Sequence, residues 1–112
     1  MERRTYRADH GDIVYWVARC DASSPWLVFL PGLTADHRLF ESQLACFESR
    51  TNCLTWDPPS HGESRPFPLV WTMSDLARYL HGILKQDGIK GMLEKVGQGH
   101  GVLDIRHAGL PI

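Results

Sequence analysis

Apolar and polar residues near the N-terminus follow the pattern of two paired β-strands. Residues 4–8 (RTYRA) and 13–19 (IVYWVAR) are rich in β-branched and aromatic residues, and the polar sequence DHGD separates them. Two such runs joined by a short glycine-containing stretch are typical of a β-hairpin. We therefore expect a hairpin at the start of the chain.

Two short apolar runs further along the chain predict buried strands. Residues 26–30 (WLVFL) end at Pro31 and Gly32, and residues 52–56 (NCLTW) end at the sequence DPPSHGES. Proline and glycine interrupt regular elements. A short, continuous apolar run is typical of a strand buried on both faces of a parallel sheet.

Two later stretches have the periodicity of amphipathic helices, in which apolar residues recur along one face. These residues are Phe40, Leu44 and Phe47 in the first stretch, which begins at Asp36, and Leu76, Leu80, Ile83 and Leu84 in the second. Thr72 and Asp75 have the spacing of a capping box, which predicts where the second helix begins. Gly88 predicts its C-cap.

The end of the chain predicts one more strand, a turn and a helix. Residues 91–96 (GMLEKV) form the strand candidate, and the glycine-rich sequence VGQGHG leads into a helix-like tail at residues 102–112. The order β-β-β-α-β-α-β-turn-α predicts an α/β fold, a mostly parallel sheet flanked by helices. The length of 112 residues fits a single domain.

Composition and charge narrow the range of partners. Hydrophobic residues make up 43% of the chain, charged residues 22%, and the net charge is -1. This balance gives no electrostatic reason to expect a nucleic acid or a membrane as partner. The N-terminus lacks the apolar segment of a secretory signal, and no apolar run approaches the roughly 18 residues of a membrane span.

Cysteine and histidine spacing gives no sign of a metal site. Cys20, Cys46 and Cys53 are odd in number and lack a C-x-x-C spacing, which favours reduced thiols in a cytoplasmic protein. The six histidines are scattered and show no H-x-x-x-H spacing with an acidic neighbour. We expect no metal ion and no cofactor.

Four sequence landmarks resemble, in order and spacing, the N-terminal half of an α/β-hydrolase domain. They are LVFLPGL, LTWDPPSHGES, LARYLHGILKQDGI and VGQGHG, and the resemblance covers roughly residues 5–108. It implies a single partial domain over residues 1–112, with strands 1 to 5 and the nucleophile elbow but without the C-terminal half.

The first landmark resembles the oxyanion loop of that family. The resemblance implies that Pro31 and Gly32 form the loop's turn and that the backbone N–H of Leu33 is one oxyanion-hole donor. Many relatives carry histidine where Pro31 stands. Physically, ligands of open α/β sheets bind at the carboxyl ends of the strands. The alternative is that Pro31 and Gly32 are only a turn.

The last landmark has the spacing of the nucleophile elbow, G-x-S-x-G. Gly97 and Gly101 match the flanking glycines, and His100 matches the residue whose N–H completes the oxyanion hole. Gly99 stands in place of the serine. Because glycine has no side chain, the elbow lacks a nucleophile.

Other polar residues of these loops are candidates for a pocket or for a structural role. His37 and His61 are possible pocket residues, whereas Asp57 and Ser64 are expected to tie down their loop through hydrogen bonds. Ser60 precedes His61 directly, and adjacent residues rarely form a nucleophile–base pair.

The C-terminal part departs from the family pattern. Asp104 and His107, three residues apart in the helix-like tail, cannot supply the acid and base of a triad. Glu94 and Lys95 interrupt a strand that should be continuously apolar. Together with Gly99, these departures favour a truncated or frame-disturbed gene.

We therefore expect a protein of the α/β-hydrolase family, of a lineage that hydrolyses small-molecule esters or amides, whose own chain is truncated and catalytically inactive. The alternative is a noncatalytic binding or interaction module. A sheet that ends after its fifth strand exposes that strand's edge, which a second copy or a complementing chain would cover.

Overall fold

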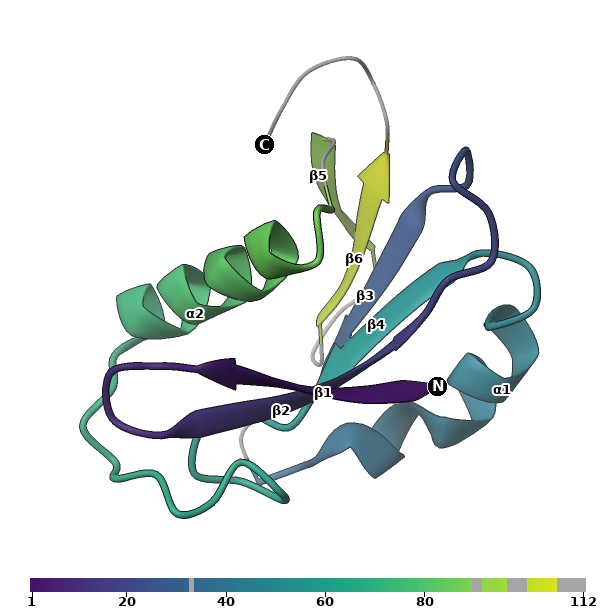
Figure 1. Ribbon diagram of the computed structural model, residues 1–112. Helices are drawn as coiled ribbons and strands as arrows, with labels where there is room; N and C mark the ends of the chain where they lie inside the picture. The colour runs from purple at the N-terminus through teal and green to yellow at the C-terminus, as the bar shows by residue number, and fades with distance from the viewer. Residues whose placement is uncertain (33, 90–91, 97–100, 107–112) are drawn as a thin grey trace.

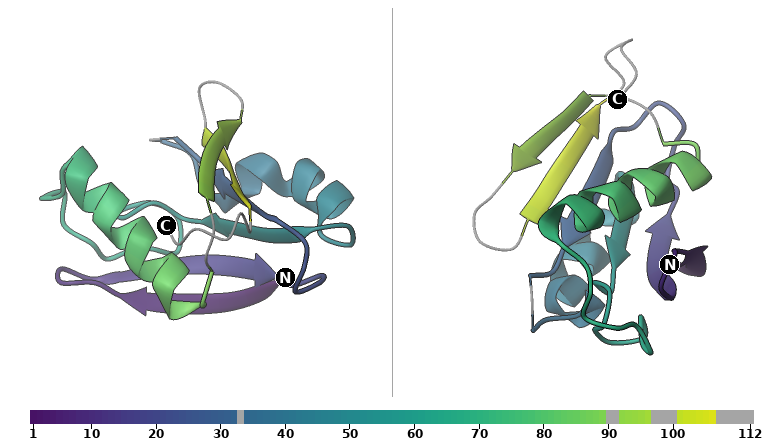
Figure 2. Two further views of the ribbon diagram at one scale, coloured as in Figure 1. Left: turned by 90° about the horizontal axis from the view of Figure 1, so that it is seen from above. Right: turned by 90° about the vertical axis from the view of Figure 1, so that its left-hand side faces the viewer.

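The protein is a six-stranded sheet with helices on both faces (Figures 1 and 2). The computed structural model describes residues 1–32, 34–89, 92–96 and 101–106, the last two ranges by their backbone. The elements are β1 (Glu2–Arg7), β2 (Asp12–Ala18), β3 (Trp26–Leu30), the 3₁₀ helix η1 (His37–Phe40), α1 (Glu41–Phe47), β4 (Asn52–Trp56), α2 (Met73–Gln86), β5 (Met92–Val96) and β6 (Gly101–Arg106).

The sheet is mixed, so the expected mostly parallel sheet of an α/β-hydrolase N-terminal half is wrong. The strand order is β1-β2-β4-β3-β6-β5. β3 and β4 form a parallel pair, whereas the β1–β2, β2–β4, β3–β6 and β5–β6 pairs are antiparallel. The expected helical tail is also wrong in its first part, because residues 101–106 are a strand.

The physical reason for this error lies in the local sequence pattern of β6. Leu103 and Ile105 alternate with Asp104 and Arg106, which is the period of a strand rather than of a helix. Two strand-like runs separated by a few residues that include glycine indicate an antiparallel pair. The glycine spacing of an elbow predicts a helix after the turn, whereas the local alternation of residues 103–106 favours the observed strand.

The charged pair of β5 fits the observed topology. Glu94 and Lys95 belong to an outer strand of the sheet, not to a central one. Outer strands commonly carry charged residues, which oppose uncontrolled pairing with other chains. The conflict between these residues and a continuously apolar central strand therefore disappears.

The elements predicted from residues 1–89 are confirmed. β1 and β2 form the expected hairpin, β3 and β4 have the expected bounds, and η1 and α1 together form the first helical stretch. α2, the longest described helix, has 14 residues. A bilayer span needs about 20 apolar residues, and no described helix is long and apolar enough to cross a membrane.

Both ends of α2 are fixed by the residues that the sequence indicated. Thr72 and Asp75 form a reciprocal capping box, in which the Thr72 N–H donates to the Asp75 carboxylate (2.8 Å). At the other end Gly88 has a φ of +66°, and the Ile89 N–H donates to the Leu84 carbonyl (2.9 Å). This is the Schellman motif, which favours glycine.

Each face of the sheet has its own hydrophobic cluster. Leu54 and Trp56 of β4 pack in the cluster that includes Tyr79 and Ile83 of α2. Cys53, their neighbour on β4, packs on the opposite face with residues of β3, η1 and α1: Phe29, Phe40 and Leu44. Because successive residues of a strand face opposite sides, β4 separates the two clusters.

A buried carboxylate connects the end of α2 to the N-terminal hairpin. The Asp87 side chain is 0% exposed and accepts hydrogen bonds from Arg4 (2.6 Å) and from the Tyr15 hydroxyl. Gln86 donates to the same hydroxyl (2.7 Å). Burial and the hydrogen bond to Asp87 raise the pKa of Tyr15 to about 12.

This raised pKa predicts a loss of stability at alkaline pH. The folded protein holds the hydroxyl proton of Tyr15 more tightly than the unfolded chain does. This contribution to stability is fully present below pH 10 and is lost as the pH rises toward 12. We expect the free energy of unfolding to fall by about 1–2 kcal/mol more over this range in the parent protein than in Tyr15→Phe. Urea unfolding at a series of pH values measures this change in the free energy of unfolding. Tyr6→Phe is the control and should keep the parent's slope; equal slopes for all three proteins would contradict the prediction.

Candidate functional site

The loops that follow β3 and β4 meet at one edge of the sheet. Because these two strands are parallel, their carboxyl ends lie together, where open sheets bind ligands. The Thr34 N–H donates to Nε2 of His61 (3.0 Å), and the His37 N–H donates to the Asp57 carboxylate (2.6 Å). Hydrogen bonds at two points along the chain therefore join the loops.

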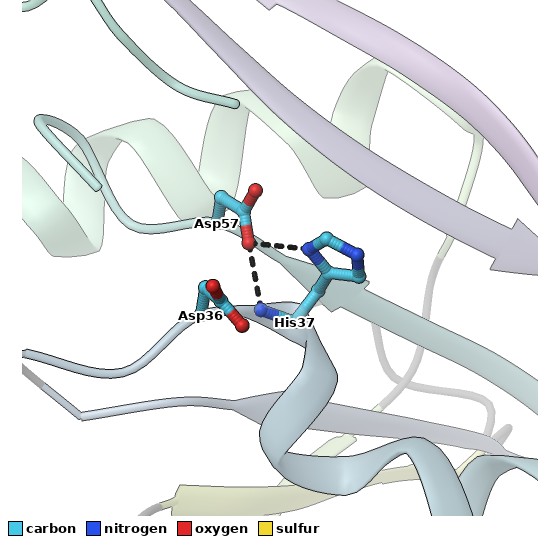
Figure 3. A group of neighbouring side chains, drawn as sticks. All are labelled: Asp36, His37 and Asp57. Carbon is cyan, nitrogen blue, oxygen red and sulfur yellow. Dashed lines mark hydrogen bonds and ion pairs between the residues drawn. The ribbon is translucent and has the colours of Figure 1, made fainter. Parts of the chain in front are cut away.

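Asp57, the first residue after β4, is the centre of this site (Figure 3). Its side chain is 0% exposed. Oδ1 accepts hydrogen bonds from the backbone N–H of His37 (2.6 Å) and from its ring Nδ1 (2.8 Å), and Oδ2 accepts one from the Glu63 N–H (2.7 Å). These three donors replace the water that a buried carboxylate loses.

The imidazole of His37 is held on two sides. Its Nδ1 faces Asp57, and its ring stacks on Trp16 with 3.8 Å between ring centroids. With the proton on Nδ1, Nε2 becomes the free nitrogen and has no hydrogen-bond partner among the described residues. A carboxylate that fixes a histidine in this way is the arrangement that orients a general base.

His37 lies beside a small open hollow between α1 and the sheet. The hollow has a volume of about 230 Å³, and its lining includes Trp16, Glu41, Leu44 and Glu48. Ligand pockets usually enclose about 300–1,000 Å³. The hollow therefore offers room for a small molecule only.

Asp36, His37 and Asp57 also come close enough to be considered as metal ligands. One ligand atom of each lies within 4.8 Å of the others. However, the Asp36 carboxylate is bound by Arg38 (2.6 Å), whose hydrogen bonds lower the pKa of Asp36 to about 2. The Asp57 oxygens already accept three N–H groups. A metal ion would have to displace these donors, so we assign none to this group.

Asp57 and Ser64 tie down their loop as the sequence predicted. The Ser64 hydroxyl is buried, donates to the Asp57 carbonyl (2.7 Å) and accepts from the Val14 N–H (2.8 Å). Gly62, with a φ of +50°, lies against the Asp57 carboxylate: a Cβ there would be 2.3 Å from Oδ2. The loop thus needs glycine at this position.

Ser60 and His61 do not form a nucleophile–base pair. The Ser60 hydroxyl donates to the Phe67 carbonyl (2.7 Å) and accepts from the indole N–H of Trp71 (3.0 Å). The His61 ring bonds through Nδ1 to the Pro59 carbonyl (2.9 Å) and through Nε2 to the Thr34 N–H. His61 lines a second open hollow, separate from the hollow beside His37.

The expected oxyanion loop is described in part. Pro31 is buried, and the Gly32 carbonyl accepts a hydrogen bond from the Ala35 N–H (3.1 Å), which closes a turn. Thr34 has a φ of +74°. Leu33 lies outside the described residues, so its role as an oxyanion donor stays a prediction.

The expected elbow falls mostly outside the described residues, which exclude Gly97, Gly99 and His100 as well as His107. Gly101 is the first residue of β6 and pairs with Leu30, the last residue of β3. Asp104 lies within β6, so the expected helical placement of this residue is wrong.

The strand before the glycine-rich sequence is not a direct neighbour of β3. β5 does not pair with β3, because β6 lies between them. Neighbouring strands are about 4.8 Å apart, so β5 lies one such spacing further from β3 than a direct neighbour would.

Comparisons with known proteins found no protein-family model that matches the chain and no curated relative. The resemblance to α/β-hydrolases therefore stays a proposal.

The pairing of His37 with Asp57 is the feature that sequence reasoning missed. The two residues are 20 positions apart, on different loops. The available signal was that both follow strands expected to be parallel neighbours, which brings the loops after them together.

We predict that Asp57→Asn destabilises the protein by about 2–4 kcal/mol, because the new amide group faces an N–H donor inside a buried site. Urea unfolding measures the change. Asp36→Asn is the matched control and should cost less than about 1 kcal/mol, because its partner Arg38 is 73% exposed. Equal costs for the two variants would contradict the central role of Asp57.

Proposed function

We propose that this chain is a noncatalytic interaction module derived from the lineage of serine hydrolases that it resembles. Two features support the lineage. The sequences LVFLPGL and DPPSHGES carry the resemblance, and the loops they contain are hydrogen-bonded together at the carboxyl ends of a parallel strand pair. Intact members of such a lineage would act on small-molecule esters or amides.

The observation that carries the noncatalytic assignment is the bonding of the serines in the site. Serine catalysis needs a hydroxyl within about 2.6–3.2 Å of a base. The hydroxyls of Ser60 and Ser64 instead donate to backbone carbonyls, and no serine hydroxyl of the described residues is hydrogen-bonded to a histidine ring. Gly99, at the nucleophile position of the resemblance, has no side chain.

We expect no serine-hydrolase activity from the purified protein. Hydrolysis of p-nitrophenyl acetate should not exceed the rate given by heat-denatured protein and should not saturate with substrate. A fluorophosphonate probe, which labels activated serines, should give no adduct in intact-mass spectrometry. A saturable rate together with a serine adduct would contradict the assignment.

Restoring a serine at the elbow should not restore activity. In Gly99→Ser the hydroxyl would remain protonated and weakly nucleophilic unless a base is positioned beside it. We expect neither a burst of p-nitrophenol nor a fluorophosphonate adduct on this variant. Gly99→Ala is the control for any effect on folding. A stoichiometric burst in the serine variant alone would show that a working base lies within reach.

The His37–Asp57 pair favours a second candidate function, general-base catalysis on a bound small molecule. Its support is the buried carboxylate that fixes the ring while Nε2 stays without a described partner. A saturable hydrolysis rate with no serine adduct, lost in His37→Gln but kept in the control His61→Gln, would establish this function. It would also replace the noncatalytic assignment.

The interaction role is supported by the position of β5. It is an outer strand that pairs with β6 on one side, and the outer strand of a sheet presents backbone N–H and C=O groups to another chain. A protein partner that adds a strand to this edge is the kind of ligand the topology suits. We propose neither a nucleic acid nor a membrane as partner.

We also propose a cytoplasmic location. Cys20, Cys46 and Cys53 are all free thiols, and the first two are exposed. Burial raises the pKa of Cys53 to about 11, which keeps this thiol protonated and unreactive. Exposed free thiols suit a reducing compartment.

A further inference from the structure

We propose that the open hollow in the loop after β4 binds a small monocarboxylate with an apolar body, such as a fatty acid of medium chain length, and that Arg65 binds its carboxylate group. The hollow has a volume of about 720 Å³, within the range of about 300–1,000 Å³ that is usual for small-molecule sites. Its described lining residues are Ser60, His61, Arg65, Pro66, Phe67 and Leu69. This inference goes beyond the proposed role of the β5 edge and does not depend on it.

The apolar part of the hollow combines a fixed side chain with an exposed one. Phe67 is only 6% exposed, and its ring packs edge-on against Tyr79 of α2, with 5.8 Å between ring centroids. Leu69, in contrast, is 78% exposed. The hollow therefore offers a preformed apolar wall and an apolar side chain that an apolar ligand would remove from water, which favours binding.

The uncharged polar side chains of the hollow are already engaged within the protein. The Ser60 hydroxyl donates to the Phe67 carbonyl (2.7 Å) and accepts from the indole N–H of Trp71 (3.0 Å). Both ring nitrogens of His61 are bonded as well, and because Nε2 accepts from the Thr34 N–H, the ring is neutral. A ligand with many polar groups, such as a peptide, would lose water there without gaining partners. These contacts favour a ligand whose body is apolar.

Arg65 supplies the charged contact. Its Nε donates to the Gly62 carbonyl (2.9 Å), which holds the side chain at the loop. Arg65 forms no ion pair with any described residue, and the neighbouring carboxylate of Glu63 is paired with Arg3 (2.9 Å). The described lining contains no acidic residue. A guanidinium is always charged and binds a carboxylate through two parallel N–H bonds, which the donors on Nη1 and Nη2 can supply.

The charge around the two hollows of the site differs. Glu41 and Glu48 line the hollow beside His37, where Arg38 is already paired with Asp36 (2.6 Å). An anion would be repelled there, whereas the hollow beside Arg65 attracts one. A single guanidinium balances one negative charge, which favours a carboxylate over a phosphate monoester with its charge of about −2.

Isothermal titration calorimetry of the full chain with octanoate tests the ligand class. We expect saturable binding. Octan-1-ol has the same chain length without the charge, and butanoate has the same charge with a shorter chain. Each should bind on the order of tenfold more weakly than octanoate or not at all. The absence of saturable octanoate binding would overturn the inference, as would equal affinities for octanoate and octan-1-ol or for octanoate and butanoate.

Two variants test the site, each with a matched control. Arg65→Met removes the charge but keeps an apolar stem, and it should weaken octanoate binding about tenfold. Arg50→Met, at another exposed arginine without a described ion pair, should bind like the parent. Leu69→Ser should also weaken binding, whereas Val70→Ser, at an exposed neighbour outside the described lining, should not.

Urea unfolding shows whether each variant is folded. If Arg65→Met loses stability because its bond to Gly62 is lost, Leu69→Ser still tests the hollow, because Leu69 is mostly exposed. A folded Arg65→Met or Leu69→Ser protein that binds octanoate as tightly as the parent would overturn the assignment of the site.

NMR of the backbone amides locates the ligand. Octanoate should shift the N–H signals of residues 60–69 and leave those of α1 unchanged. Shifts concentrated in α1 would place the ligand in the hollow beside His37 and overturn the inference. None of these results bears on the role of the β5 edge, so the failure of one proposal leaves the other standing.

Discussion

The arrangement of the site depends on the buried carboxylate of Asp57. It stands at the end of β4 and accepts two hydrogen bonds from His37, in η1 after the β3 loop, and one from Glu63 in its own loop. A carboxylate without these N–H groups would be costly to bury. The backbone of its own loop also lies close to this carboxylate at Gly62, where a Cβ would be 2.3 Å from it. The parallel pairing of β3 and β4 brings these groups within reach.

Hydrogen bonds within these loops engage their serine hydroxyls and the ring of His61. Ser60, Ser64 and His61 are all used to join backbone segments, so none is free to act as nucleophile or base. β6 lies between β3 and β5, so the strand before the glycine-rich sequence is not a neighbour of β3. These contacts support the proposal that the chain acts through the edge of its sheet and not through a serine nucleophile.

Features encoded locally were predictable from the sequence, whereas features that depend on the pairing of distant segments were not. The strands at residues 26–30 and 52–56 and the capping box of Thr72 each follow from a few adjacent residues. The His37–Asp57 contact depends on which strands are neighbours. For β6 the local alternation indicates the observed strand, whereas the glycine spacing before it indicates an elbow followed by a helix. The proposed oxyanion donors Leu33 and His100 lie outside the described residues and stay predictions.

The central claim is that the loops after β3 and β4 form one hydrogen-bonded unit held by Asp57. Amide hydrogen exchange measured by NMR tests it most directly, because it reports the protection of individual N–H groups. The account predicts that the N–H groups of His37 and Glu63 exchange as slowly as those of β4. Exchange of these two groups at rates typical of exposed loops would show that Asp57 does not hold the site together and would contradict the account.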